Sequence, residues 1–404
     1  MKILMLGWEL PPHNSGGLGV ACYQLCKALS KYAVDVEFIL PYQADHGIDF
    51  MNVTAAHPQD VETIIKSGIA YDSYKYVLSD GREEWHDIFD QQQMFEVAVG
   101  QIVRMREFDI IHSHDWLTFR AALRAKQVLG CPLVLHVHSV ESDRAGGHRG
   151  NSLVREIEEM AFHAADTVIA ISDWTRQAIM RDYGIPADKI EVIHNSIERA
   201  DIVPLDIGLA NTYQYLASLR AQGYRVVTNV GRLTVQKGLP NLLQAAKIVL
   251  AYAPKTMFVI VGSGEQYFEL IELAANLGIA KNVIFTGFQR GKPWRDAFAI
   301  GDLFVMPSVS EPFGLTPLEA IGYGTPSLIS KQSGVSEVLS NTLKVDFWDI
   351  DEMANQIIAV VQNDPLRDEL IKNAMKELDR FSWNDAAGKL FNLYRQYVPA
   401  EAAA

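Results

Sequence analysis

The chain has 404 residues, of which 49% are hydrophobic and 21% charged, and its formal net charge is −13. This composition is that of an ordinary globular protein, and the length allows two domains with separate hydrophobic cores. The negative charge argues against nucleic acid as the main partner, so a site for an anionic ligand must be built locally from a few cations. No apolar run approaches the roughly 20 residues that span a bilayer, so no integral membrane segment is expected.

The first strand and the cysteines indicate the compartment. The first strand, residues 1–6, is short, lacks a basic n-region and leads straight into a glycine-rich loop, so it is interpreted as a core strand and not as a signal peptide. Cys22 and Cys26 lie one helical turn apart, and Cys131 stands alone. Three cysteines argue against a disulfide framework and favour a reducing compartment, the cytoplasm.

Apolar, strand-like runs alternate with amphipathic helices along the chain. Near-continuous Val, Ile and Leu runs separated by helices indicate parallel sheets that are covered on both faces. The polar stretch 201–222 separates two such sets and is expected to be a linker. We therefore predict an α/β fold of two doubly wound, Rossmann-like domains, residues 1–200 and 223–382, that face one another across a cleft. The expected strands are 2–7, 34–40, 109–112, 132–138, 167–171, 225–231, 256–262, 282–286, 302–306 and 325–330.

A glycine-rich loop follows the first strand, and its Gly16 and Gly17 open a helix that runs to Leu29. A strand, a glycine-rich loop and a helix N-terminus let backbone N–H groups approach a diphosphate. Ligands of open α/β sheets bind at loops that follow the strand C-termini. The loop matches neither a P-loop nor the spaced Gly-x-Gly-x-x-Gly pattern, so a tight turn without a ligand is the alternative.

Four histidines come in two pairs at predicted strand ends, His112 with His114 and His136 with His138. Residues two apart share one face of a strand. We expect His112 and His136 to lie deeper and to be hydrogen-bonded, and His114, Asp115 and His138 to be exposed at the strand ends. Imidazoles at this spacing can bind a metal, but no cysteine accompanies them in the sequence, so no metal site is predicted.

Two cations, Arg232 and Lys237, flank the first strand-to-helix turn of the second half. In an acidic chain this placement favours a phosphate site, with Arg as a fork and Lys as a point charge, although solvated surface charge is the alternative. The loop 142–151 also combines cations with glycines. It suits either a cover over an anionic or sugar ligand or a plain mobile loop.

The stretch from Glu311 to Glu319 joins an apolar strand to a helix. Thr316, Pro317 and Glu319 match a capping box with Thr316 at the N-cap. Gly314 would then turn its backbone toward a helix N-terminus, which attracts an anion. The alternative is that Glu319 is only a cap and Glu311 only a solvated loop residue.

Together these motifs resemble the retaining nucleotide-sugar glycosyltransferases of the two-Rossmann-domain (GT-B) type, in the glycosyltransferase family 4-like group that includes bacterial glycogen and starch synthases. The resemblance covers roughly residues 1–40 and 105–400. In this family the chain crosses back to the first domain, so helix 383–398 is expected to join it. The matching motifs are Gly16-Gly17-Leu18, the strand end at His138, Gly231-Arg232-Leu233 with Lys237-Gly238, the Glu311 and Glu319 pair, and Phe381-Ser382-Trp383.

The resemblance implies roles for the matching residues. Arg232 and Lys237 would hold the donor diphosphate, Glu311 the hydroxyls of the donor sugar, and Glu319 the ribose hydroxyls. His138 would contact the sugar near the reacting carbon. The other candidate substrate-binding residues are Gly16, Gly17, Asp115, Phe288, Phe313, Gly314, Leu315 and Thr316.

The implied reaction moves a hexose, glucose in the first instance, from a UDP-, ADP- or GDP-sugar to a hydroxyl of a carbohydrate or other acceptor, with retention. No metal and no cofactor is expected. An epimerase or phosphorylase on the same fold, or a non-catalytic nucleotide-sugar binding protein, is the alternative. Asn14 stands where glycogen and starch synthases carry Lys, so their preference for ADP-glucose is not transferred, and a role in α-glucan synthesis stays one option.

Overall fold

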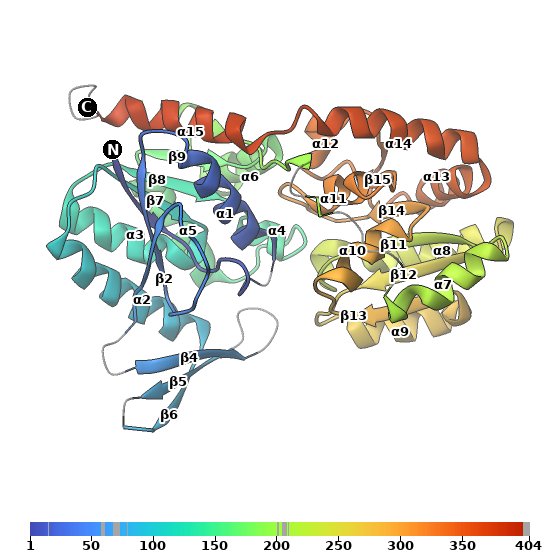
Figure 1. Ribbon diagram of the computed structural model, residues 1–404, viewed down its shortest axis with the longest axis horizontal. Helices are drawn as coiled ribbons and strands as arrows, with labels where there is room; N and C mark the ends of the chain where they lie inside the picture. The colour runs from blue at the N-terminus through green and yellow to red at the C-terminus, as the bar shows by residue number, and fades with distance from the viewer. Residues whose placement is uncertain are drawn as a thin grey trace. The chain divides into compact units, whose positions relative to one another are not determined.

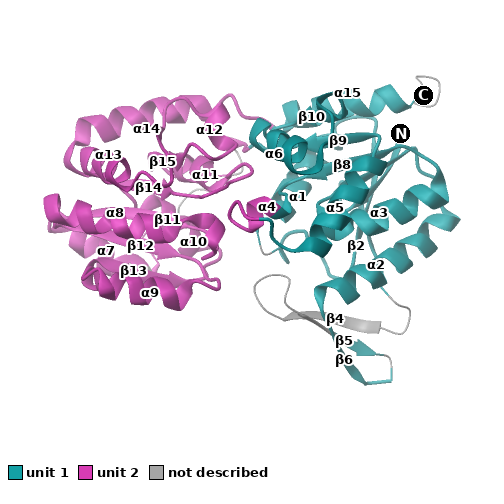
Figure 2. Ribbon diagram, turned by 180° about the vertical axis from the view of Figure 1, so that it is seen from behind, with its two compact units in different colours: residues 1–141, 149–196, 383–404 teal, residues 142–148, 197–382 magenta. Residues whose placement is uncertain are grey.

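The computed structural model describes residues 1–14, 16–57, 61–67, 73–78, 80–199, 202–203, 208 and 210–398, with the backbone alone at 61–67, 73–75 and 212. It divides into two compact units (Figure 2). Unit 1 comprises residues 1–141, 149–196 and 383–404, and unit 2 comprises 142–148 and 197–382. Each unit holds its own parallel sheet (Figure 1).

The seven-stranded sheet of unit 1 has the order β10-β9-β8-β7-β1-β2-β3, and every pair is parallel. The five strands predicted for this half are confirmed. β3 and β10 were not predicted, because polar residues interrupt both of them, as in Asn-Val-Thr-Ala and Ile-Glu-Val, and neither contains a continuous apolar run. The strands are β1 Lys2–Leu6, β2 Asp35–Leu40, β3 Asn52–Ala55, β7 Ile110–His114, β8 Leu133–Val137, β9 Thr167–Ala170 and β10 Ile190–Val192.

Helices cover both faces of this sheet, because successive strand residues point to opposite sides. Leu4 and Leu6 pack into one buried cluster, whereas Ile3 and Met5 pack into the other. The second cluster includes α15, which returns from the end of the chain and packs on α1. The helices are α1 Gly17–Leu29, α2 Ile88–Ile102, η1 Val103–Met105, α3 Trp116–Leu129, α5 Ser152–Ala164, α6 Asp173–Tyr183, η2 Ala187–Lys189 and α15 Trp383–Tyr397, and α4 Glu141–Arg144 begins at the last residue of a unit 1 segment.

Between β3 and α2 the chain forms a small antiparallel sheet, in a region to which the sequence pattern assigned no function. Its strands are β4 Val61–Ser67, β5 Ser73–Leu78 and β6 Glu83–His86, in the order β4-β5-β6. Tyr76 of β5 is buried and donates its hydroxyl to Gln91 Oε1 of α2. This contact ties the small sheet to the main body of unit 1.

The six-stranded parallel sheet of unit 2 has the order β13-β12-β11-β14-β15-β16. All five strands predicted for this half are confirmed, and the three-residue β16 is an addition. The strands are β11 Arg225–Val230, β12 Thr256–Val261, β13 Val283–Gly287, β14 Leu303–Met306, β15 Ser327–Ser330 and β16 Leu343–Val345.

The interval 201–222, expected to be an irregular linker, contains helix α7 and so differs from that expectation. Tyr213 and Leu216, three residues apart, bury one face of α7, and the Ala210 N–H donates to Asp296 Oδ2 at 2.7 Å. The helices of unit 2 are α7 Asn211–Ala221, η4 Val235–Lys237, α8 Leu239–Tyr252, α9 Tyr267–Asn276, η5 Ala280–Asn282, α10 Lys292–Ala299, α11 Thr316–Gly322, α12 Val335–Val338, α13 Ile350–Gln362 and α14 Asp364–Leu378. Among the described helices, none is both long enough and apolar enough to cross a membrane.

Asp302, at the start of β14, anchors a cluster of cations in unit 2. Its side chain is 1% exposed, and its Oδ2 accepts the Val226 N–H at 2.8 Å. Its Oδ1 lies 3.2 Å from Arg220 Nη2, 3.4 Å from Arg225 Nη1 and 3.3 Å from Arg367 Nη1. Removing this carboxylate would leave three guanidinium groups without their shared buried partner.

We therefore expect Asp302→Ala to lower the free energy of unfolding by about 3–5 kcal/mol, the usual cost of breaking a buried pair. Asp364 is the matched control, because it pairs with two of the same arginines but is 51% exposed. Asp364→Ala should lower the free energy of unfolding much less, because exposed ion pairs are screened by water. Urea denaturation measures the free energy of unfolding of both variants. An equal decrease in the two would contradict the role of Asp302 as a buried anchor of the three arginines.

Candidate active site

Each sheet reverses its strand order between two central strands, β1 and β7 in unit 1 and β11 and β14 in unit 2. In open parallel sheets ligands bind beyond the C-terminal ends of the strands at such a switch point. The candidate residues follow these strands or their neighbours: His138 follows β8, Arg232 follows β11 and Glu311 follows β14. The topology therefore brings the candidates of each unit to one edge of its sheet.

In unit 2, Lys237 and Glu311 form an ion pair although they lie 74 positions apart in the chain. Lys237 Nζ is 2.5 Å from Glu311 Oε2, and Ser308 Oγ donates to the same oxygen at 2.9 Å. The side chains are only 20% and 11% exposed. An ammonium group has three donors, so Lys237 keeps hydrogen-bonding capacity for an anionic ligand while Glu311 holds it in place.

The turn that carries Lys237 packs closely against the residues that follow β14. Gly238 has φ +63°, and a Cβ there would lie 2.2 Å from the carbonyl oxygen of Pro307. The Val309 N–H donates to the Gln236 carbonyl at 2.9 Å. Only glycine fits this close approach with a positive φ, and the approach brings Lys237 beside Glu311.

The loop after Glu311 is held from the other side by the segment that follows β15. The Glu311 N–H donates to the Gln332 carbonyl at 2.9 Å, and the Val335 N–H donates to the Phe313 carbonyl at 2.7 Å. Phe313 is only 2% exposed, so its ring belongs to the core and a ligand can meet only its backbone. Gly314 has φ +98°, a conformation that favours glycine.

The capping-box prediction is wrong. Helix α11 begins at Thr316, Leu315 occupies the N-cap, and no side chain caps the helix. Leu315 already has helical angles, φ −76° and ψ −30°, whereas a capping side chain needs an extended residue at that position. The Glu319 carboxylate is thus not held by a cap, and burial raises its pKa from 4.5 to about 7.

Two further candidates of unit 2 present side chains that a ligand can reach. Arg232 is half-buried, and its guanidinium makes no hydrogen bond or ion pair with the residues that the structure describes. Phe288 is 46% exposed, and the guanidinium of Arg290 lies 5.2 Å from its ring centroid. Arg232 is therefore available to an anion and Phe288 to a flat ring.

In unit 1 the rings of the four histidines stack on one another at the ends of β7 and β8. His114 is directly opposite His136, and their ring centroids are 5.1 Å apart. His112 Nδ1 is 2.5 Å from the Tyr394 hydroxyl of α15, and its Nε2 is 3.2 Å from His136 Nδ1. The prediction that His112 and His136 lie deep and hydrogen-bonded is confirmed.

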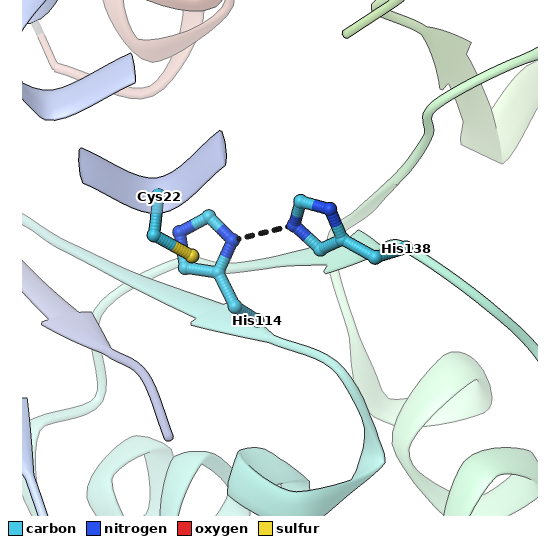
Figure 3. Close-up of side chains that lie close together, drawn as sticks. All are labelled: Cys22, His114 and His138. Atoms are coloured by element: carbon cyan, nitrogen blue, oxygen red, sulfur yellow. Dashed lines mark hydrogen bonds between the residues drawn. The ribbon is translucent and has the colours of Figure 1, made fainter. Parts of the chain in front are cut away.

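The prediction that His114, Asp115 and His138 are exposed is wrong, because they are only 0%, 6% and 9% exposed. Helix α1 lies beside these strand ends, and its Cys22 lies close to both His114 and His138 (Figure 3). Burial, followed by the neighbouring histidines, holds the pKa of His138 well below its usual value. The ring is therefore neutral at neutral pH.

Cys22 is the residue that the sequence reasoning missed. The absence of a cysteine near the histidine pairs in the sequence was the reason to dismiss a metal, but the fold brings Cys22 from α1 to them. The available signal was its position five residues after Gly17. A helix that follows the first strand of a doubly wound sheet must pack on that sheet, and one of its faces then meets the strands.

Asp115 positions the end of β8. It has φ +60° and ψ 167°, and no other non-glycine residue in the described part of the chain has a positive φ. Its Oδ1 accepts the backbone N–H groups of His138 at 2.6 Å and Ser139 at 3.3 Å. These hydrogen bonds fix the backbone from which the His138 side chain extends. Asp115 Oδ1 is therefore already engaged in holding the structure.

Gly16 and Gly17 lie exposed at the start of α1, and Gly16 is the N-cap. Gly16 has φ −160°, which any residue adopts, and a Cβ there would meet nothing within 4 Å. Neither the backbone conformation nor local packing therefore requires glycine at position 16.

The strain at Asp115 can be separated from its hydrogen bonds by two substitutions. Asp115→Ala loses the hydrogen bonds and keeps the strained backbone, whereas Asp115→Gly loses the bonds but relieves the strain. Such strain costs about 1–3 kcal/mol, so we expect the Ala variant to be the less stable by that amount. Denaturant unfolding of both variants measures this difference, and a Gly variant as unstable as the Ala variant would contradict it.

Glu319 should make stability depend on pH. Its pKa is about 7 in the folded chain against 4.5 for an ordinary glutamate, so the folded state retains a proton that the unfolded state releases between these values. Stability should therefore fall as pH rises from about 4.5 to 7 and then level off. Glu319→Gln should remove this decrease of stability with pH, and thermal unfolding at a series of pH values measures it. Glu269→Gln, on the exposed face of α9, is the control and should retain the wild-type slope.

Comparisons with known families agree with the two-unit architecture. Residues 15–201 match the family described as Glycosyltransferase Family 4, and residues 216–377 match the family described as Glycosyl transferases group 1.

Three relatives extend the match over most of the chain. An uncharacterized glycosyltransferase of Methanocaldococcus jannaschii is 28% identical over an alignment of 404 positions that covers 98% of each chain. A glycogen synthase of Mycobacterium tuberculosis is 27% identical over 84% of this chain and 80% of its own. A D-inositol 3-phosphate glycosyltransferase of Salinispora arenicola is 30% identical over 72% of this chain and 70% of its own.

A solved structure of Anabaena HepE in complex with UDP-glucose has a TM-score of 0.71 and is 20% identical, covering 98% of this chain and all of that one. At this identity the likeness concerns the fold. Together with the two family matches and the relatives, it confirms what the motifs implied: the chain belongs to the glycosyltransferase family 4-like enzymes of the GT-B fold.

Proposed function

We propose that this glycosyltransferase moves a hexose, glucose in the first instance, from a nucleoside diphosphate sugar to an acceptor hydroxyl, with retention and without a metal or other cofactor. The observation that carries the proposal is the ion pair of Lys237 with Glu311 beside Ser308. It places a cation and a carboxylate together where a ligand of a doubly wound sheet binds. HepE was solved with UDP-glucose, which favours UDP as the nucleotide.

The cations of unit 2 supply the main catalytic effect in this proposal. The bond between the anomeric carbon and the diphosphate oxygen breaks, and negative charge grows on the leaving diphosphate. Lys237, held by Glu311, and Arg232, which has no partner among the described residues, stabilise that charge. A preorganised cation acts only where charge develops, so it lowers the barrier more than it strengthens donor binding.

Glu311 has a second proposed task. A carboxylate accepts several hydrogen bonds, so Glu311 can keep Lys237 and Ser308 while it accepts from hydroxyls of the donor sugar. Because the segment after β15 fixes its backbone, the carboxylate is oriented before the donor binds. This preorganisation favours one orientation of the sugar.

The remaining donor contacts follow the accessible groups of unit 2. Glu319, free of the helix cap, accepts from the ribose hydroxyls, and the exposed ring of Phe288 lies beside the base. The diphosphate also meets backbone groups of the loop that holds Phe313, Gly314, Leu315 and Thr316. In unit 1, the exposed Gly16 and Gly17 would offer their backbone to a diphosphate, and a Cβ at Gly16 would meet nothing within 4 Å.

His138 is the proposed contact of unit 1 to the donor sugar. Its neutral ring can donate or accept a hydrogen bond without adding a charge near the reacting carbon. In the retaining reaction the acceptor oxygen attacks the face that the diphosphate leaves. The acceptor proton passes to the departing phosphate oxygen, so no protein base is required. Asp115 acts as a positioning residue through the His138 backbone.

Nucleotide release from a panel of UDP-, ADP- and GDP-sugars tests the proposal, with short α-glucans, inositol phosphates and other hydroxyl compounds as acceptors. We expect slow release without an acceptor, fast release with the right one, and an α-linked product from an α-linked donor by NMR. A β-linked product would overturn retention. Release with no acceptor bond formed would favour an epimerase, and a requirement for inorganic phosphate would favour a phosphorylase.

In the same assay Lys237→Ala should lower turnover on the order of 10²-fold, the usual effect of removing one such contact. Glu311→Ala should lose turnover similarly, because Lys237 is then no longer held. The matched control is Lys331, whose ion pair with Asp346 is also short at 2.8 Å but is exposed. Lys331→Ala should keep wild-type turnover, and equal effects at positions 237 and 331 would remove Lys237 from the site.

A further inference from the structure

We propose that unit 1 carries a zinc site formed by the Cys22 thiol and the imidazoles of His114 and His138 (Figure 3). One potential ligand atom from each side chain lies within 4.8 Å of the other two. The three come from different elements: Cys22 from α1, His114 from the end of β7 and His138 from the residue after β8. The tertiary fold therefore assembles a ligand set that no stretch of the sequence contains.

The rings of His114 and His138 face one another through their nitrogens. The His114 side chain is fully buried, and its Nδ1 lies 3.0 Å from His138 Nε2. Its other ring nitrogen, Nε2, has no hydrogen-bond partner among the described residues. A tautomer that carries its proton on Nε2 leaves the lone pair of Nδ1 to a metal.

The spacing is close to what zinc requires. Zinc binds imidazole nitrogen at about 2.0–2.1 Å and thiolate sulfur at about 2.3 Å in a tetrahedron, which puts two nitrogens about 3.3–3.4 Å apart. The 3.0 Å separation of the two imidazoles needs only a few tenths of an ångström of spreading. Zinc puts a sulfur and a nitrogen ligand about 3.5 Å apart, so Cys22 must approach from at most 4.8 Å by about 1.3 Å or less, within the reach of a side-chain rotation on α1.

The chemistry of the three groups selects the metal. Two imidazoles and one thiolate suit zinc, whereas magnesium, calcium and manganese prefer oxygen ligands. Burial lowers the pKa values of His114 and His138, so both rings are neutral and keep a lone pair. The Cys22 thiol must lose its proton to solvent when the metal binds.

A second histidine set, His112 with His114 and His136, also lies close together but is a poorer site. A metal in either set would displace one contact between two histidines, but in this set the other ring nitrogen of His112 is also occupied, by the Tyr394 hydroxyl. This set also lacks a thiol. The Cys22 set contains the thiol and the least buried of the four histidines, His138 at 9% exposure, which gives a metal its nearest approach from solvent.

The functional consequence rests on the proposed role of His138 in binding the donor sugar. A zinc ion that holds the His138 ring removes it from the sugar, so the metal inhibits the transferase and does not serve as its cofactor. The presence of the metal site itself does not depend on that role.

Cobalt(II) and zinc titrations of the purified full chain test the site. Bound cobalt should show a thiolate-to-metal charge-transfer band and the intense visible bands of tetrahedral coordination, and zinc should displace it at one ion per chain. Cys22→Ser should abolish the charge-transfer band and weaken binding at least about tenfold. Cys26→Ser is the matched control, since Cys26 is equally buried on the same helix, and it should keep the band. Circular dichroism confirms that each variant is folded.

The outcomes separate the site from its consequence. A wild-type chain without the charge-transfer band, or the same band in Cys22→Ser, would overturn the zinc site, and His114→Gln repeats this test if Cys22→Ser does not fold. Zinc inhibition that a chelator reverses and that Cys22→Ser escapes would support the role of His138. Zinc binding without inhibition would overturn that role alone. If the chain shows no transfer activity at all, the proposed function fails while the cobalt spectrum still decides the metal site.

Discussion

Parallel strand pairing is the constraint on which both halves of this protein depend. All strands of a parallel sheet end at the same edge, so the residues that follow different strands must converge there. In unit 2 the convergence brings Lys237 and Glu311 within 2.5 Å, and in unit 1 it brings His114 and His138 together. The candidate groups of each unit therefore lie at or beyond the C-terminal ends of its strands.

This convergence has an energetic cost, because several polar groups at the strand ends and in the helix that follows β14 lie wholly or partly out of water. Glu319 is half-buried with a pKa near 7, Asp115 is strained, and His114 has a ring nitrogen without a partner among the described residues. The packed sheets around them supply the stability that permits this. Groups held in this way bind a ligand without first reorganising. This preorganisation favours a reaction whose transition state is stabilised by fixed charges.

The sequence predicted the strands that lie in a continuous apolar run and missed those that do not. An apolar run identifies a buried strand, but polar residues interrupt β3, β10 and β16. Local patterns also failed where neighbouring segments decided the conformation. Thr316 matches a capping box, yet the loop makes Leu315 helical and moves the helix start by one residue. His114 stands at a strand end, yet α1 covers it, and exposure cannot be read from one strand alone.

By itself the sequence determined the alternation of strands and helices, the common face of the histidine pairs and the order of the glycosyltransferase motifs. These follow from backbone periodicity and local residue chemistry, which act over a few neighbouring positions. Only the tertiary structure decided that Lys237 meets Glu311 across 74 positions and that Cys22 lies beside His114. Such contacts depend on how whole elements pack, and the physical reason is that no local pattern encodes which side chains two packed elements bring together.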